Sequence, residues 1–128
     1  MDGFVLTQIR LYEMTSTSME PTIIGQGNPP THHGDYVIIS KAVHHPLSRG
    51  DLVLVSLRGI RGPLVTTIRR VAGAPGDLVP DLKETNSTVA VTLGYYYLLA
   101  DATNALDSRQ LGLFSHTQID GKVLFVIH

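Results

Sequence analysis

Two serines stand two positions apart in the segment of residues 15–22, which reads Thr-Ser-Thr-Ser-Met-Glu-Pro-Thr. Ser16 and Ser18 are candidates for hydroxyl chemistry, and the ring of Pro21 restricts the backbone beside them. A serine hydroxyl is a weak nucleophile at neutral pH, so it needs a base within hydrogen-bond distance before it can attack a carbonyl. Without such a base, the same residues describe an ordinary polar turn.

Charged residues concentrate in two later segments. Arg69 and Arg70 lie in a β-branched run that leads into an Ala-Pro-Gly-Asp turn at residues 74–77. Asp101, Asp107 and Arg109 belong to a polar segment that ends at Gly112. By themselves, the arginines fit a strand edge protected by charge, and the later segment fits an ion-paired surface loop.

The elements that must position these side chains are predicted to be strands. Short runs rich in β-branched and aromatic residues recur between Gly, Pro, Asn and Asp, a pattern typical of an all-β domain. No stretch keeps the apolar spacing of an amphipathic helix for three turns. We expect a short helical turn within residues 103–111 and an exposed loop at residues 81–87. The predicted strands are residues 4–11, 35–41, 51–57, 64–72, 88–93, 95–99 and 122–127.

The composition describes one soluble domain over residues 1–128. Hydrophobic residues make up 43% and charged residues 16% of the chain, which is enough apolar material for a core. Ten basic and eleven acidic side chains give a formal net charge of −1, so nothing favours nucleic acid or an anionic membrane as a partner. Cysteine is absent, which excludes disulfides, thiolate metal sites and a cysteine nucleophile.

The first ten residues have neither the basic start and long apolar stretch of a signal peptide nor the length of a membrane helix. We therefore expect a cytoplasmic protein with no membrane-spanning segment.

Taken in order, the segments resemble the motifs of the type I signal peptidases. The resemblance begins with Ser-Met-x-Pro-Thr at residues 18–22 and Gly-Asp followed by a strand that ends in lysine at residues 34–41. It continues with Arg-Gly-Asp before an apolar strand at residues 49–53 and with Arg-x-x-Gly-x-Pro-Gly-Asp at residues 70–77. Asp101, the sequence Asp-Ser-Arg at residues 107–109 with Gly112, and Gly-Lys-Val at residues 121–123 complete it. The match extends over residues 14–127, nearly the whole chain.

The resemblance implies a coiled, mostly antiparallel β-barrel-like fold and a role for each matching residue. Ser18 aligns with the nucleophile, and Ser16 aligns with a hydroxyl that forms the oxyanion hole together with a backbone N–H. Such a donor contributes about 3–4 kcal/mol in the transition state. Apolar strands beside Ser18 would line a cleft for small residues of an extended peptide. The positions expected to support or line this site are Met19, Arg70, Asp101, Asp107 and Arg109, of which the four charged residues would form a salt-bridged scaffold.

The position of the general base departs from the family pattern. Bacterial signal peptidases have a lysine there and the eukaryotic branch has a histidine, whereas this chain has Arg69. A guanidinium stays protonated at neutral pH and does not accept a proton from serine. Losing a positioned base costs about 10²- to 10⁴-fold in rate. The Gly-Asp-Asn motif of the family is also changed, to Ala100-Asp101-Ala102, and the following loop is one residue shorter and has no clear counterpart of the serine that steadies the lysine.

Other residues are weaker candidates for the base. Lys41 aligns with a family position outside the catalytic pair, and no motif supports Lys83 or Lys122. The histidine pairs at residues 32–33 and 44–45 flank one predicted strand, and His116 and His128 stand alone. Because neighbouring strand residues point to opposite faces, each pair offers at most one ligand to a metal. We expect no metal and no cofactor.

Three functional hypotheses remain. The first is a serine endopeptidase of the signal peptidase class, with Ser18 activated by an unconventional base. The second is a repurposed, non-proteolytic enzyme whose apolar cleft binds a small or peptide-like molecule, with Arg69, Ser16 and Ser18 as hydrogen-bond donors. The third is a non-catalytic domain that binds extended peptides by strand addition.

Overall fold

Strands make up most of the regular structure of the described residues, together with two short helical turns. In the computed structural model, residues 8–58 and 64–128 are described. The strands are β1 (Ile9–Glu13), β2 (Tyr36–Ser40), β3 (Leu52–Arg58), β4 (Leu64–Gly73), β5 (Leu78–Pro80), β6 (Thr88–Ala90), β7 (Tyr95–Leu99), β8 (Phe114–Ser115) and β9 (Ile119–Ile127), and the helices are α2 (Ser108–Leu111) and the 3₁₀ turn η1 (His116–Gln118). None of the helices in these two ranges has the length and apolar character needed to cross a membrane.

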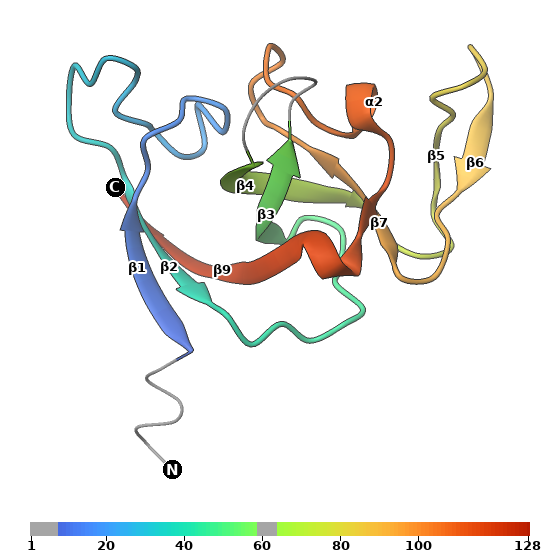
Figure 1. Cartoon of the computed structure of the whole chain (residues 1–128), viewed down its shortest axis with the longest axis horizontal. Coiled ribbons are helices and arrows are strands. Elements are labelled where there is room, and N and C mark those ends of the chain that lie inside the picture. The colour runs from blue at the N-terminus through green and yellow to red at the C-terminus, as the bar shows by residue number, and fades with distance from the viewer. Residues whose placement is uncertain (1–7, 59–63) are drawn as a thin grey trace.

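Seven strands form one curved sheet in the order β1-β2-β9-β3-β4-β7-β8, and β5 and β6 form a separate hairpin (Figure 1). All strand pairs are antiparallel, which confirms the predicted all-β, mostly antiparallel fold. The first and last strands in the order do not pair with each other, so the described strands form an open sheet and not a closed barrel. The hairpin and β1 lie at opposite ends of the molecule (Figure 1).

Most predicted strands are present, with shifted ends. The strand expected at residues 4–11 begins outside the described residues, and β1 continues to Glu13. The strand expected at residues 88–93 ends at Ala90, before the turn at Gly94 whose φ of 87° favours glycine. The helical turn is α2, capped by Asp107, and residues 81–87 contain no strand. We did not predict β5 or β8, because two- and three-residue strands are too short to show an alternating pattern.

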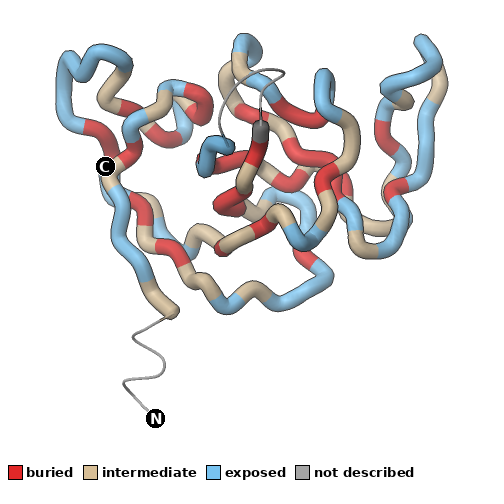
Figure 2. Tube along the Cα trace, viewed as in Figure 1, coloured by how far each residue is buried: buried red, intermediate tan, exposed pale blue. Residues whose placement is uncertain are grey.

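The buried residues among those described form three clusters, and the β5–β6 hairpin is mostly exposed (Figure 2). One cluster of buried side chains underlies the segment that carries the two serines. Met19 and Ile23, both fully buried, anchor that segment to β2, β3 and β4. Burying two such side chains stabilises the folded chain by about 3–6 kcal/mol. The members of this cluster are Met14, Met19, Ile23, Val37, Ile39, Leu54, Ile68 and Ala100.

Candidate active site

The segment after β1 turns sharply and brings Ser16 and Ser18 together. The backbone N–H of Glu20 donates to the carbonyl of Thr17 at 3.1 Å, and that of Ile23 donates to Met19 at 3.0 Å. Gly25 packs against this turn, and a Cβ atom there would lie only 1.9 Å from the carbonyl oxygen of Ser16. The close approach of the two backbones therefore requires glycine at this position.

Ser16 and Ser18 bond to each other. The Ser16 hydroxyl donates to Ser18 Oγ at 2.8 Å, and the backbone N–H of Ser18 donates to Ser16 Oγ at 3.1 Å. The family resemblance assigns the Ser16 hydroxyl to the oxyanion hole together with a backbone N–H, and these two bonds occupy the Ser16 hydroxyl and the N–H of Ser18. In this structure they satisfy each other, and only 7% of Ser18 is exposed. A tetrahedral oxyanion would have to displace these bonds before it could be stabilised.

Arg69 is the side chain that meets Ser18 from β4. Its Nη1 donates to Ser18 Oγ at 2.9 Å and to the carbonyl of Ile68 at 2.7 Å, and its Nε donates to the carbonyl of Leu106 at 2.9 Å. Thr67, two residues earlier on the same strand, accepts a longer bond of 3.4 Å from Nη1. Ser18 Oγ thus accepts two hydrogen bonds, one of which comes from a cation.

Arg69 is buried, with 4% of the residue exposed. Burial lowers the pKa of its guanidinium; Asp107 opposes this shift, and Arg109 adds to it. Because guanidinium groups remain protonated in proteins even when their pKa is lowered, Arg69 is a donor at neutral pH and cannot act as the base for Ser18.

The four charged positions expected to form a scaffold make two ion pairs. Arg70 bonds Asp101 through Nε and Nη2, at 3.0 and 2.8 Å. Arg109 bonds Asp107 through Nε at 2.9 Å and Nη2 at 2.6 Å. The bidentate geometry in both pairs is the strong form of the arginine–carboxylate interaction.

Hydrogen bonds set the pKa of both carboxyl groups. The bond from Arg70 lowers the pKa of Asp101 and outweighs burial, and Thr22 adds a further bond. Burial alone would raise the pKa of Asp107, which is fully buried. The bonds from the Arg109 side chain and from the backbone N–H groups of Ala100 and Arg109 together lower it. Both aspartates are therefore ionised at neutral pH.

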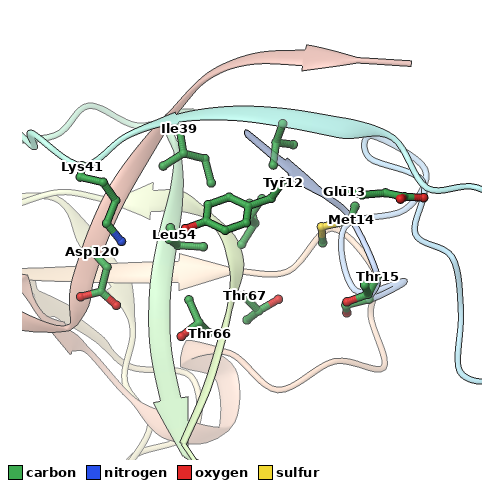
Figure 3. Close-up of a pocket in the computed structure, with 13 residues that line it drawn as sticks. Tyr12, Glu13, Met14, Thr15, Ile39, Lys41, Leu54, Thr66, Thr67 and Asp120 are labelled. Atoms are coloured by element: carbon green, nitrogen blue, oxygen red, sulfur yellow. The ribbon is translucent and has the colours of Figure 1, made fainter. Parts of the chain in front are cut away.

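A cavity of about 520 Å³ opens beside Ser16 (Figure 3). Its wall is formed by the end of β1 and residues 14–16 on one side and by Thr66, Thr67 and Ile68 of β4 on the other. Lys41 and Asp120 lie at the opposite end of the cavity from Thr15 (Figure 3). Met19, expected at the site from the resemblance, does not line this cavity; its sulfur accepts a bond of 3.4 Å from the backbone N–H of Asp101.

Within residues 8–58 and 64–128, the hydrogen bonds to Ser18 Oγ come from Ser16 and Arg69. No lysine or histidine in these ranges bonds Ser18; Lys41 lines the cavity at the end opposite Thr15, and several of the others have partners elsewhere. Their contacts are Lys122 with Asp51 at 3.7 Å, His33 with Glu13 at 3.8 Å, His128 with Asp35 at 2.7 Å, His32 with Thr31 at 2.9 Å, and His45 with Tyr96 at 2.9 Å and with the ring of His116. The same ranges contain no group of three or more metal-ligating side chains.

Two hydrogen-bond partners of Arg69, Leu106 and Thr67, were not predicted from the sequence. The bond from Arg69 to Leu106 uses a backbone carbonyl, for which the residue type gives no signal. Thr67 could have been found, because residues two apart in a strand point to the same face.

The sequence matches the family described as signal peptidase, peptidase S26, over residues 3–80. It is also 34% identical over 114 residues to the mitochondrial ATP-independent inner membrane protease subunit 1b of Arabidopsis thaliana. That match covers 84% of this chain and 63% of the plant protein, so the chain spans less than two thirds of its relative's length. The name of the relative refers to a mitochondrial inner membrane, and the expected cytoplasmic location therefore stays a prediction.

Proposed function

This chain belongs to the signal peptidase family, peptidase S26, and we propose that it binds an extended peptide segment in the family's cleft without hydrolysing it. The observation that carries the proposal is the bond of 2.9 Å from Arg69 Nη1 to Ser18 Oγ. A serine whose oxygen accepts a bond from a cation has a less available lone pair, and among the described residues no base bonds Ser18 to remove its proton.

An unpaired edge of β4 beside the cavity supports binding by strand addition. β4 pairs with β3 from Leu64 to Arg70, but with β7 only from Arg70 onward. On the side that faces away from β3, residues 64–69 of β4 therefore have no strand partner among the described strands. Since Thr66 and Thr67 on that edge and residues 14–16 both line the cavity, an extended peptide between them would gain backbone hydrogen bonds.

The apolar lining of the cavity favours a bound peptide with small or apolar side chains. Val37, Ile39, Leu54 and Ile68 present apolar surface to it, and all four belong, with Met14, to the buried cluster beneath the serines. Apolar pockets of this kind select side chains by size and by the polar groups at their rims.

The experiment combines binding with product analysis. A panel of labelled extended peptides with small residues is titrated by fluorescence anisotropy, and the same mixtures are examined by mass spectrometry. We expect wild type to bind without cleavage. Thr66→Trp, which fills the cavity, should weaken binding at least about tenfold. Thr88→Trp, an equally exposed strand position on the β5–β6 hairpin, should leave binding unchanged.

The second candidate is the serine endopeptidase. The retained pair of Ser16 and Ser18, with their oxygens 2.8 Å apart, favours it. Cleavage by wild type that disappears in Ser18→Ala would establish this candidate in place of our proposal. A base would then have to reach Ser18 in the peptide complex.

A further inference from the structure

We propose that Ser16, Ser18 and Arg69 form a carboxylate site, and that the bound peptide presents its own C-terminal carboxylate to it. This inference rests on the proposed function and specifies its ligand: a peptide that ends at Ser18, in place of one that runs through the cleft.

The first argument is charge. Three guanidinium groups, Arg69, Arg70 and Arg109, stand around the site with two carboxylates, Asp101 and Asp107. Each carboxylate forms a bidentate pair with one arginine, which leaves three positive minus two negative charges, a net charge of +1. Among the described residues, no carboxylate lies within 4.0 Å of the Arg69 guanidinium. Asp107 acts on Arg69 without a direct ion pair. A buried cation with no directly paired carboxylate is costly, and an anionic ligand reduces that cost.

The second argument is the direction of the hydrogen bonds. Ser18 Oγ accepts from Ser16 and from Arg69, so its own hydrogen remains to be donated. The bond from Arg69 polarises this hydroxyl and makes it a stronger donor. The Ser16 hydroxyl and the Ser18 backbone N–H, now bonded within the pair, are two more donors at the same place. Such a donor-rich group beside a positive charge suits a carboxylate better than a neutral peptide carbonyl.

The third argument is that the peptide carboxylate can enter the cavity without repulsion from the acidic residues that line it. Ser16 lines the cavity, so a peptide lying along β4 can bring its end to Ser16, whose hydroxyl bonds Ser18. The two carboxylates that also line the cavity are occupied elsewhere. Glu13 accepts a bond of 2.9 Å from the backbone N–H of Gly34 and points away from Thr67 (Figure 3), and Asp120 accepts one of 2.5 Å from Ser56 at the far end.

The test compares two peptides of identical sequence, one ending in a free carboxylate and one in a carboxamide. We expect wild type to bind the acid at least about tenfold more tightly than the amide, because hydrogen bonds to a charged group are stronger than those to a neutral one. Arg69→Gln should bring the two affinities together. Arg49→Gln removes the same charge at an exposed position beside Asp77 and should retain the full preference for the acid.

The outcomes separate this inference from the proposed function. Equal binding of acid and amide by wild type would overturn the carboxylate site and leave peptide binding in place. Failure of both peptides to bind wild type would overturn the proposed function and this inference with it. A preference that survives in folded Arg69→Gln would assign the carboxylate to another site and overturn the inference. If Arg69→Gln does not fold, Ser18→Ala replaces it, and an undiminished preference for the acid in Ser18→Ala would overturn the inference equally.

Discussion

Arg70 and Asp101 form a bidentate ion pair that joins β4 to the segment after β7, with Nε–Oδ1 and Nη2–Oδ2 distances of 3.0 and 2.8 Å. The same carboxylate accepts the hydroxyl of Thr22 at 2.5 Å, and the next residue, Ala102, donates its backbone N–H to the carbonyl of Ser18 at 2.9 Å. The pair therefore fixes the serine segment against β4, the strand that carries Arg69.

Arg70→Met should lower the free energy of unfolding by about 1–2 kcal/mol, because a bidentate, partly buried pair is worth more than an exposed one. Peptide affinity should fall as well, because the ion pair that helps to hold the serine segment against β4 is lost. Urea denaturation measures the first effect and fluorescence anisotropy the second. Arg49→Met is the matched control, because its contact with Asp77 is 3.6 Å long and exposed, and it should change stability by less than about 0.5 kcal/mol. Equal effects of the two substitutions would contradict this role of Arg70.

Asp107→Asn should destabilise the fold more strongly than Arg70→Met, by about 3–5 kcal/mol, because it breaks a buried charge pair. Asp107 is fully buried, and its oxygens accept the backbone N–H groups of Ala100 at 2.8 Å and Arg109 at 2.9 Å. An asparagine has only one side-chain oxygen for these donors, and its NH₂ group would face the donors that the second oxygen now accepts. Chemical denaturation monitored by circular dichroism checks this value, and a loss below about 1 kcal/mol would show that the carboxylate is dispensable.

Stability should also fall in acid. The pKa values of Asp101 and Asp107 lie below their ordinary value of 3.8. A carboxyl group with a lowered pKa in the folded state stabilises the fold above the unfolded-state pKa, and that contribution is lost as pH falls through the folded-state pKa. The free energy of unfolding should therefore be insensitive to these groups near pH 7 and decrease below about pH 4. Denaturation curves from pH 7 to pH 2 measure it, and a stability that rises over the acidic part of this range would refute the assignment.

Gly25→Ala should disturb the serines directly. Its Cβ would lie 1.9 Å from the carbonyl oxygen of Ser16 and 2.9 Å from that of Thr15, so the backbone must move. We expect peptide affinity to fall at least about tenfold together with stability. Gly50→Ala is the control: its φ of 95° strains alanine by about 1 kcal/mol, but its Cβ would contact nothing within 4 Å. If both substitutions weaken peptide binding equally, stability alone accounts for the effect.

The residues of the candidate site were more predictable from the sequence than their arrangement in space. The ordered motifs in the sequence indicate Ser16, Ser18 and four charged residues, and the structure brings the charged residues together as Arg70–Asp101 and Arg109–Asp107. Their functional roles remain predictions. The strands were also predictable, because runs such as residues 52–58 carry β-branched and apolar side chains that fit a sheet.

The remaining features depend on long-range packing. Lys41 and Asp120 share a cavity because β2 and β9 pair, and this pairing contains a register shift between Ile38 and Ile39 that no local pattern reveals. The closure of a barrel depends on strand tilt and stagger around the whole sheet, and the open order from β1 to β8 could not be read from separate segments. The mutual bonding of Ser16 and Ser18 depends on side-chain orientation, which the spacing leaves open.

Arg69→Lys should create peptide cleavage that depends on Ser18. The position is buried, with 4% of the residue exposed, and burial lowers the pKa of a lysine, so part of its amine would be neutral and able to take the serine proton. The carbonyl of Leu106 and the hydroxyl of Thr67, which now bond Arg69, would orient the new amine. We expect a cleavage rate about 10²- to 10⁴-fold above the background measured with wild type, the usual contribution of a positioned base. Mass spectrometry of the peptide panel measures it.

The pH dependence and a double variant decide whether the new amine is the base. A lysine base must lose its proton first, so cleavage by Arg69→Lys should increase as pH rises toward and above its lowered pKa and then level off. Ser18→Ala combined with Arg69→Lys should abolish the activity, because the attacking oxygen is gone. Cleavage that persists in the double variant would point to a contaminating peptidase. A folded Arg69→Lys variant that binds peptide but never cleaves it would mean that Arg69 is not the only obstacle, and that the mutual bonds of Ser16 and Ser18 must also open before an oxyanion can be held.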